Sequence, residues 1–367
     1  MKLGLGLYRH MLAPEYYDFA RQAGCTHIFV HLVDYFRGGV RNPRDNQPTG
    51  GKYSPWGVAG DPESLWTVDE MRAVRLAIEG AGLKLAGIEN LDPGHWYDVL
   101  LNGPLRAEHI ENVKTIIQRM GEAEIPILGY NFSIAGVCGR VSGPFGRGRA
   151  ITVGMEGLAD DVPVPAGMVW NMVYGDRARG VLASISHDEL WCRFAHFLQE
   201  IIPIAEQSGV RLALHPDDPP MPTMRRQPRL VYQPWMYQRV LDLMPSWSNA
   251  LELCVGTLAE MTEGDVYEAV DRYSRQGVIS YVHLRNVKGK VPHYCETFID
   301  EGDVNIAKVL SILRRNGFDG VIVPDHTPQM SCLAPWHTGM AHTLGYMAGA
   351  LARLEMRDEN ETEPRLS

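Results

Sequence analysis

The amino-acid sequence predicts a (β/α)8 barrel, an α/β fold, formed by one catalytic domain over residues 1–355 with long loops after some strands. Eight segments with strand character alternate with eight segments that carry helix signals, which is the pattern of this barrel. The chain has 367 residues, 45% of them hydrophobic and 22% charged, and single α/β barrels reach this size. An open, doubly wound sheet is the alternative, but no GxGxxG or Walker sequence follows a strand.

The first half of the chain supplies four strands and four helices. Short apolar runs predict strands at residues 3–8, 26–32, 83–90 and 125–132. Helices are predicted at residues 14–23, 68–81, 107–120 and about 188–208. Thr67 with Glu70, and Ser186 with Glu189, have the spacing of a capping box at a helix N-terminus.

The second half repeats the alternation. Val210, Leu212 and Leu214 give a strand pattern that cannot continue through Pro216, because proline has no backbone N–H to donate to a neighbouring strand. Three more strands are predicted within residues 250–256, 279–286 and 320–326, and helices near 232–243, 264–275, 304–315 and 339–354. The C-terminal strand ends are where a barrel of this kind carries its active site.

Two connections are longer than ordinary loops between a strand and a helix. Residues 34–66 are rich in Gly, Pro and Asn, and they are either a lid or a surface insertion. Residues 133–185 form a Gly-rich excursion that is too long for a passive connection. After residue 355 the chain ends in a polar tail, residues 356–367.

Composition excludes several classes of protein. The formal net charge of −9 argues against a nucleic-acid-binding surface, which normally carries a basic patch. The chain contains no stretch of about 18 apolar residues and no apolar N-terminal segment, so we expect a cytoplasmic protein without a membrane partner. The six Cys residues include no CxxC pair and fit reduced thiols. We further expect a homo-oligomer, a dimer or a tetramer.

Four potential metal ligands stand at equivalent places, the C-terminal ends of four consecutive strands. His215, Cys254, His283 and Asp325 end the strands near residues 214, 254, 283 and 324. Corresponding residues on adjacent strands lie about 5 Å apart, so these side chains can meet at one ion. Imidazole, thiolate and carboxylate together favour Zn²⁺, Fe²⁺ or Mn²⁺. Taken singly, such a His is more often a structural residue and such a Cys a packed thiol.

Other polar residues lie at the same rim. Glu89 and Asn90 end the third strand, and Tyr130 and Asn131 end the fourth, where each is either a hydrogen-bonding rim residue or a substrate contact. Arg285 follows His283 by two residues and therefore lies on the same face of its strand, suited to a substrate carboxylate. The alternative for Arg285 is a salt bridge to Asp217 or Asp218. Two loop residues, Arg147 and Arg149, are either anion clamps or solvated charges.

Several of these segments resemble the D-mannonate dehydratase family of xylose-isomerase-like TIM barrels. The resemblance rests on LALHPDDPP (212–220), LELCVGT (251–257), YVHLRNV (281–287), CETFIDEG (295–302) and IVPDH (322–326), and more loosely on GIEN and GYNF. It covers roughly residues 80–350. It implies that Mn²⁺ or Fe²⁺ is held by the four residues already named and that the substrate is a six-carbon sugar acid.

The resemblance also implies a reaction, the dehydration of D-mannonate to 2-keto-3-deoxy-D-gluconate. In this resemblance, His326 matches a residue placed for proton transfer, and Asp217 and Asp218 match residues near the metal. We take His326, Asp217, Tyr130 and His337 as catalytic candidates, and Arg285, Asn286, Asn131, Asp218 and Glu89 as candidates for substrate contacts. The family carries a Tyr after the PDH motif, whereas this chain offers His337 or Met340 there, and Tyr346 later. A metal-dependent isomerase or epimerase acting on a related sugar remains an alternative, as does a sugar-acid binding protein.

Overall fold

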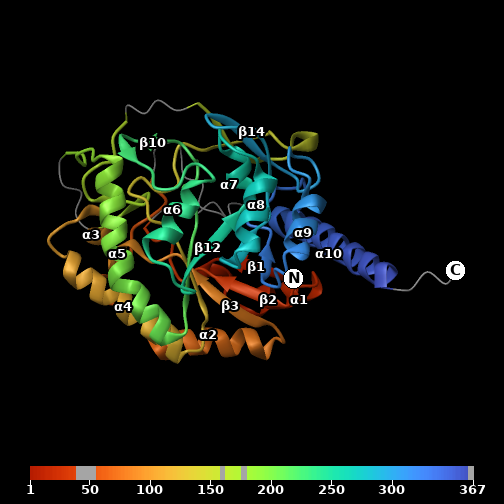
Figure 1. The fold of residues 1–367 in the computed structure, drawn as a ribbon, viewed down its shortest axis with the longest axis horizontal. Coiled ribbons are helices and arrows are strands. Elements are labelled where there is room, and N and C mark those ends of the chain that lie inside the picture. The colour runs from red at the N-terminus through yellow and green to blue at the C-terminus, as the bar shows by residue number, and fades with distance from the viewer. Residues whose placement is uncertain (39–54, 158–161, 175–179, 363–367) are drawn as a thin grey trace.

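Eight parallel strands close into a barrel, as predicted (Figure 1). The computed structural model describes residues 1–38, 55–157, 162–174 and 180–362. Around the barrel, the strand order is β1-β16-β13-β12-β9-β4-β3-β2. The strands are β1 (Lys2–Leu7), β2 (His27–Val30), β3 (Lys84–Glu89), β4 (Ile127–Tyr130), β9 (Arg211–Leu214), β12 (Asn249–Cys254), β13 (Ile279–His283) and β16 (Val321–Val323).

The eight predicted helices are all present. They are α1 (Pro14–Gln22), α2 (Val68–Gly80), α4 (Arg106–Glu122), α5 (His187–Ser208), α6 (Met236–Leu243), α8 (Val266–Arg275), α9 (Ile306–Arg315) and α10 (Pro335–Thr362). Two short helices, α3 (Tyr97–Leu101) and α7 (Val255–Glu260), and three 3-10 turns at 9–11, 93–95 and 147–149 are added to them. The last helix continues into the segment expected as a tail and extends beyond the barrel in Figure 1.

The predicted capping box forms completely at α2, and at α5 only its Ser186 half forms. The side chain of Thr67 accepts a hydrogen bond from the backbone N–H of Glu70, whose carboxylate accepts one from the N–H of Thr67, at 3.2 and 2.8 Å. Ser186 accepts from the N–H of Glu189 at 3.1 Å. These bonds satisfy backbone donors that have no partner within the helix, which fixes where α2 and α5 begin.

Side-chain alternation divides each barrel strand between two apolar layers. Leu3, Leu5 and Leu7 of β1 belong to the large cluster between the strands and the helices. A smaller cluster includes Phe29 of β2 and Tyr281 of β13, whose rings stack with centroids 4.0 Å apart. Since β2 and β13 are not neighbours in the sheet, their rings meet across the barrel interior. The next inward position along each strand therefore faces the C-terminal mouth.

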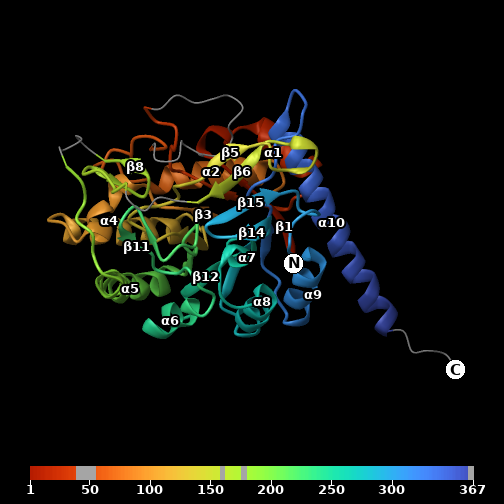
Figure 2. The same ribbon diagram turned by 90° about the horizontal axis from the view of Figure 1, so that it is seen from above.

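A second, antiparallel sheet arises from the loops, which the sequence did not predict. Its strands β14 (Asn286–Lys290), β15 (His293–Thr297), β6 (Thr152–Glu156) and β5 (Val141–Gly143) lie side by side in that order (Figure 2). The excursion after β4 thus pairs with the hairpin after β13. The same excursion carries a small hairpin of β7 (Met168–Val169) and β8 (Met172–Val173), and a third pair, β10 (Thr223–Met224) and β11 (Gln227–Pro228), follows β9.

The long connection after β2 is described only in part. Residues 39–54, which include most of the expected lid or insertion, lie outside the described residues. Beyond them, Val58 forms a bridge to Val173 of β8, so the end of this connection is tied to the excursion after β4. None of the helices in the described part of the chain is long and apolar enough to cross a membrane.

Candidate functional site

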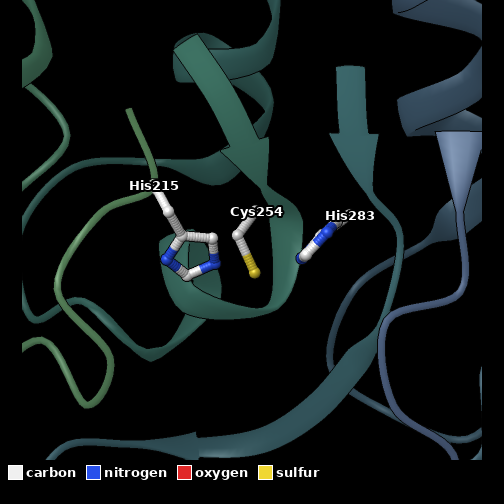
Figure 3. Close-up of side chains that lie close together, drawn as sticks. All are labelled: His215, Cys254 and His283. Carbon is white, nitrogen blue, oxygen red and sulfur yellow. The ribbon is translucent and has the colours of Figure 1, made fainter. Parts of the chain in front are cut away.

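His215, Cys254 and His283 converge at the C-terminal mouth of the barrel, as Figure 3 shows. One ring nitrogen of each His and the sulfur of Cys254 all lie within 4.8 Å of one another. They come from the ends of β9, β12 and β13, which are neighbours in the barrel. Their convergence follows from strand register, since Cys254 pairs with His283 across the two strands.

A second group of potential ligands, Glu89, Glu252 and His283, overlaps the first and also lies within 4.8 Å. The Nε2 atom of His283 is 3.0 Å from Glu252 and 3.2 Å from Glu89. Glu252 did not emerge from the sequence reasoning. A signal was present, because Glu252 precedes Cys254 by two residues and therefore shares its inward face.

The electrostatics of the first group suit a cation. Burial alone would raise the pKa of the Cys254 thiol, but Arg285 and hydrogen bonds from His215 and His283 lower it to about 5. The hydroxyl of Thr257 also donates to the sulfur, at 3.1 Å. A thiolate is the form of Cys that binds a metal. Two imidazoles and a thiolate, with two carboxylates beside them, are donors that fit a divalent transition metal.

The two carboxyl groups beside His283 have opposite pKa shifts. Burial raises the pKa of Glu252, and repulsion from Glu89 adds to it, giving a value of about 8. Burial would also raise the pKa of Glu89, but His31 and His283 lower it to about 2. Two adjacent carboxyls that cannot both ionise readily are a natural proton store or cation site.

Asp325, the fourth expected ligand, lies beside the group and outside its 4.8 Å limit. Its Oδ1 atom is 3.5 Å from Nδ1 of His283, and its Oδ2 atom accepts a hydrogen bond from Nε of Arg285 at 3.0 Å. The backbone of Asp325 is left-handed, with φ 51°. Asp325 follows the inward Val323 by two residues, as Val323 follows the inward Val321, and it lines the cavity.

Arg285 is enclosed by carboxylates, so the salt-bridge alternative describes its surroundings. It donates to Asp218 at 2.8 Å, to Glu260 at 2.5 Å and to Asp325. Only 2% of Arg285 is exposed, and it does not line the cavity. Because its donors are already engaged by protein carboxylates, they are not available to a substrate carboxylate without a rearrangement.

His326 is held by two acidic residues at the cavity wall. Its Nδ1 atom is 3.0 Å from Glu296 of β15, and its Nε2 atom is 3.3 Å from Asp325. Burial lowers the pKa of His326, but Asp325 and Glu296 raise it by more, so the net shift is upward. Glu296 lies within the CETF segment, and the sequence reasoning gave it no role.

The cavity at the barrel mouth contains about half of the expected site residues. Those lining it are Glu89, Asn131, His215, Asp218, His283, Asp325 and His326. The lining residues that the sequence reasoning gave no role include Tyr8, His31, Tyr35, Trp56, Arg140 and Trp170. Tyr8 and His31 follow β1 and β2 at inward positions, so alternation was a usable signal for both. Trp56, Arg140 and Trp170 come from long loops, which carry no such periodic signal.

Two residues expected in catalysis point away from the cavity. Asp217 accepts hydrogen bonds from the backbone N–H groups of Leu230 and Val231 and pairs with Arg229 at 3.0 Å. Tyr130 follows the inward Gly129 by one residue, so its ring faces the helices and meets Phe197 at 5.9 Å. Asp217 thus fixes the loop at Leu230 and Val231, and Tyr130 packs in the core between the strands and the helices.

Three other expected residues are also engaged elsewhere. Asn286 donates to the carbonyl oxygens of Ile299 and Val304 at 2.8 and 2.9 Å, which fixes the loop after β15. His337 packs against the rings of Tyr16 and Phe19 on the outside of the barrel. Arg147, the loop residue considered as an anion clamp, pairs with Asp300 at 2.9 Å. None of the three lines the cavity.

Comparisons with known proteins agree on one family. The family model described as D-mannonate dehydratase (UxuA) matches residues 46–138 and 177–355. A mannonate dehydratase of Streptococcus pneumoniae is 30% identical over 277 residues, which cover 71% of this chain and 74% of that protein. Mannonate dehydratase 2 of Halalkalibacterium halodurans is 30% identical over 278 residues, covering 71% and 79%.

Solved structures share the fold. The crystal structure of mannonate dehydratase from Streptococcus suis serotype 2 superposes with a TM-score of 0.75 at 23% identity, covering 99% of this chain and 96% of that one. A D-psicose 3-epimerase from Clostridium cellulolyticum has a TM-score of 0.57 at 11% identity, covering 96% and 99%. From the extent of the family match and the identity to its relatives, this chain belongs to the D-mannonate dehydratase family of hydro-lyases.

Proposed function

We propose that this protein is a metal-dependent hydro-lyase that converts D-mannonate to 2-keto-3-deoxy-D-gluconate and water. The observation that carries the proposal is the convergence of His215, Cys254 and His283 within 4.8 Å at the mouth of a barrel of this family. Mixed nitrogen, sulfur and oxygen donors fit Zn²⁺, Fe²⁺ or Mn²⁺, and the family resemblance favours Mn²⁺ or Fe²⁺ among them. Asp325 would join them after the short movement of a side chain.

The reaction requires loss of the C2 proton and of the C3 hydroxyl group. When bound, a divalent cation supplies Lewis-acid stabilisation of the negative charge that develops next to the carboxylate. His326 donates a proton to the C3 oxygen, which then leaves as water. Its position suits this role, because Glu296 holds Nδ1 and raises the pKa of the ring, while Nε2, beside Asp325, would face the C3 oxygen once Asp325 moves to the metal.

The C2 proton needs a base, and His31 has suitable properties. It lines the cavity, 7% exposed, with Nδ1 3.1 Å from the hydroxyl of Tyr35 and Nε2 3.7 Å from Glu89. Burial lowers the pKa of His31 from its ordinary value, which keeps the ring neutral and able to accept a proton. His31 and His326 would then serve as base and acid at the same cavity.

The direct test uses protein loaded with Mn²⁺ or Fe²⁺ and a panel of hexonates, hexuronates and keto-sugars. Formation of a 2-keto-3-deoxy acid from D-mannonate, with a mass lower than the substrate by one water, is the expected result. If another hexonate, and not D-mannonate, loses one water, the proposed dehydration stands and the proposed substrate is wrong.

A metal-dependent epimerase or isomerase is the second candidate function. The pair Glu89 and Glu252 supports it, because two facing carboxyls with opposite pKa shifts could remove and return a proton. A product with the same mass as the substrate, and with deuterium incorporated from D₂O, would favour this reaction over dehydration.

A further inference from the structure

Three aromatic rings line one part of the cavity. Tyr35, Trp56 and Trp170 pack in mutual contact, with ring centroids 5.5 to 5.8 Å apart. They line the same cavity as the candidate metal group. We call these three residues the aromatic wall.

Trp170 stands in a backbone conformation that its side chain disfavours. It forms, with Asn171, the two-residue turn between β7 and β8, and both residues have positive φ, at 47° and 59°. A turn with two such residues usually contains Asn-Gly, since a bulky side chain is strained there. Strain of this kind costs about 1–3 kcal/mol and is concentrated at functional positions.

Neighbouring segments hold the turn in place. The N–H of Trp170 donates to the carbonyl of Ile134 at 2.8 Å, and the side-chain amide of Asn171 donates to Val137 at 3.0 Å. The N–H of Trp56 donates to the carbonyl of Asn171 at 2.9 Å. A Cβ atom added to Gly136 would lie 2.5 Å from the carbonyl carbon of Trp170, so the close approach requires glycine there. The fold therefore imposes the strained position on Trp170.

The aromatic wall offers hydrogen-bond donors that the protein leaves unused. Trp170 is only 4% exposed, and its indole N–H has no acceptor among the described residues. The buried indole N–H of Trp56 likewise has none in the described part of the chain. A buried N–H without a partner costs about 1–3 kcal/mol, which an acceptor bound in the cavity would recover after a small rotation of the ring toward it.

We propose that Trp170, together with Trp56, binds the hydroxyl groups at the far end of an open-chain sugar acid and so selects its length. This inference rests on the proposed function, which puts C2 and C3 of the substrate at the candidate metal group. From that group, contacts run from His283 through Glu89 and His31 to Tyr35, at 3.2, 3.7 and 3.1 Å. Tyr35 thus adjoins His31, the proposed base at C2, and Trp56 and Trp170 are reached from the reacting carbons through Tyr35.

The neutral hydroxyl groups of the sugar acid match the aromatic wall better than its carboxylate does. The cationic lining residues Arg140 and His326 are grouped with Asp218 and Glu296 beside β15, with Arg140 3.3 Å from Glu296. A substrate carboxylate belongs near cations, whereas indole N–H groups donate to uncharged oxygen and the ring faces cover C–H groups. Trp170 also lies between the two ranges that the family model matches, in the part of the excursion outside that match.

The test compares the binding of sugar acids of two chain lengths, six carbons and four carbons. Calorimetry measures the binding of D-mannonate, other hexonates and a four-carbon acid with the same configuration at C2 and C3 to metal-loaded protein. It is done in the His326→Asn background, in which turnover should be slow. Trp170→Phe keeps a ring and removes the donor. Trp191→Phe is the matched control, because Trp191 is buried in α5 and does not line the cavity.

Trp170→Phe should weaken binding of the six-carbon acid about 3- to 10-fold, the value of one hydrogen bond, and leave the four-carbon acid unchanged. Equal losses for both acids would mean that Trp170 only holds the fold, and no loss for either would remove its donor role; both results overturn the proposal. If D-mannonate is not a substrate but another hexonate shows the length-dependent loss, the subsite stands and the proposed substrate falls. If D-mannonate is turned over but Trp170→Phe leaves the preference for the longer acid unchanged, the proposed substrate stands and the subsite falls.

Discussion

At the scale of single residues, the position of His326 leads to a prediction about catalysis. His326→Asn removes the group that donates a proton to the C3 oxygen, while an amide can keep one hydrogen bond to Glu296. We expect kcat to fall about 100-fold or more, the usual effect of losing a general acid, with metal content unchanged. Steady-state kinetics on D-mannonate and elemental analysis measure the two quantities.

The pH dependence of kcat provides the control for that prediction. Burial lowers the pKa of His326 and its two carboxylate neighbours raise it by more, so the folded-state pKa lies above 6.5. The acid form is therefore lost as the pH rises through the raised pKa, where kcat should fall. A variant that retains this alkaline limb at near-normal turnover would show that another group is the acid.

Arg285 leads to a prediction about stability. Three carboxylates, those of Asp218, Glu260 and Asp325, surround its guanidinium group in a buried place. Arg285→Met removes the buried cation that these three groups share and leaves only Arg140 beside Asp218 and the two His beside Asp325. We expect the free energy of unfolding of metal-free protein to fall by about 3–5 kcal/mol. Denaturant unfolding followed by circular dichroism measures it.

An exposed pair is the matched control for Arg285. Arg147 and Asp300 lie 2.9 Å apart with 51% and 32% of their side chains exposed. Arg147→Met should cost less than about 1 kcal/mol, because water screens the pair. Similar losses in both variants would mean that the network around Arg285 gains little from burial.

At the scale of elements, the N-terminus of α2 gives a prediction with a pH dependence. Thr67→Ala removes the hydrogen bond to the N–H of Glu70 and should lower the free energy of unfolding by about 1 kcal/mol at neutral pH. Hydrogen bonds from the backbone and side chain of Thr67 lower the pKa of Glu70 from its ordinary value of 4.5. The contribution of Glu70 is thus present above pH 4.5 and is lost as the pH falls through its lowered pKa.

The measurement for this cap is denaturant unfolding of both proteins at pH 7 and near pH 3, with Ser186→Ala as a comparison at α5. Ser186 caps its helix without the reciprocal carboxylate bond, so its loss should depend less on pH. A difference between Thr67→Ala and the unmodified protein that is the same at both pH values would contradict the role given to Glu70.

Alternation along the strands explains which site residues could be found at this scale. His215, Cys254 and His283 all occupy inward positions at strand ends, and register brings them together. The same rule would have selected Glu252 and His31, and would have set aside Tyr130, which follows the inward Gly129. Tyr130 was expected at the site and Glu252 was not, because the prediction used which residues end a strand and not which face of the strand they occupy.

At the scale of the whole molecule, a bound metal should stabilise the barrel. The ligands come from β9, β12 and β13 and are assembled only in the folded state, so a divalent metal binds the native protein and raises its melting temperature by mass action. Chelation should reverse the increase. Cys254→Ala should abolish most of the increase and lower the metal content after dialysis, as measured by differential scanning fluorimetry and elemental analysis.

Cys25→Ala is the control for this comparison. Cys25 is also a buried thiol, 3% exposed, but burial raises its pKa to about 12 and it packs in the apolar layer outside the strands. Its variant should keep the metal-dependent increase even if its melting temperature is lower. An equal metal-dependent increase in Cys254→Ala would mean that the thiol is only a packed core residue.

The sequence by itself determined the barrel, its eight strands and helices, and the three residues that converge in Figure 3, because strand and helix patterns and strand ends are local properties. The family also followed from short motifs at those strand ends. Tertiary structure alone decided that Arg285 is enclosed by Asp218, Glu260 and Asp325, and that Trp56, Arg140 and Trp170 line the cavity. Their positions depend on how the excursion after β4 pairs with the hairpin after β13, a contact between distant segments that no local periodicity encodes.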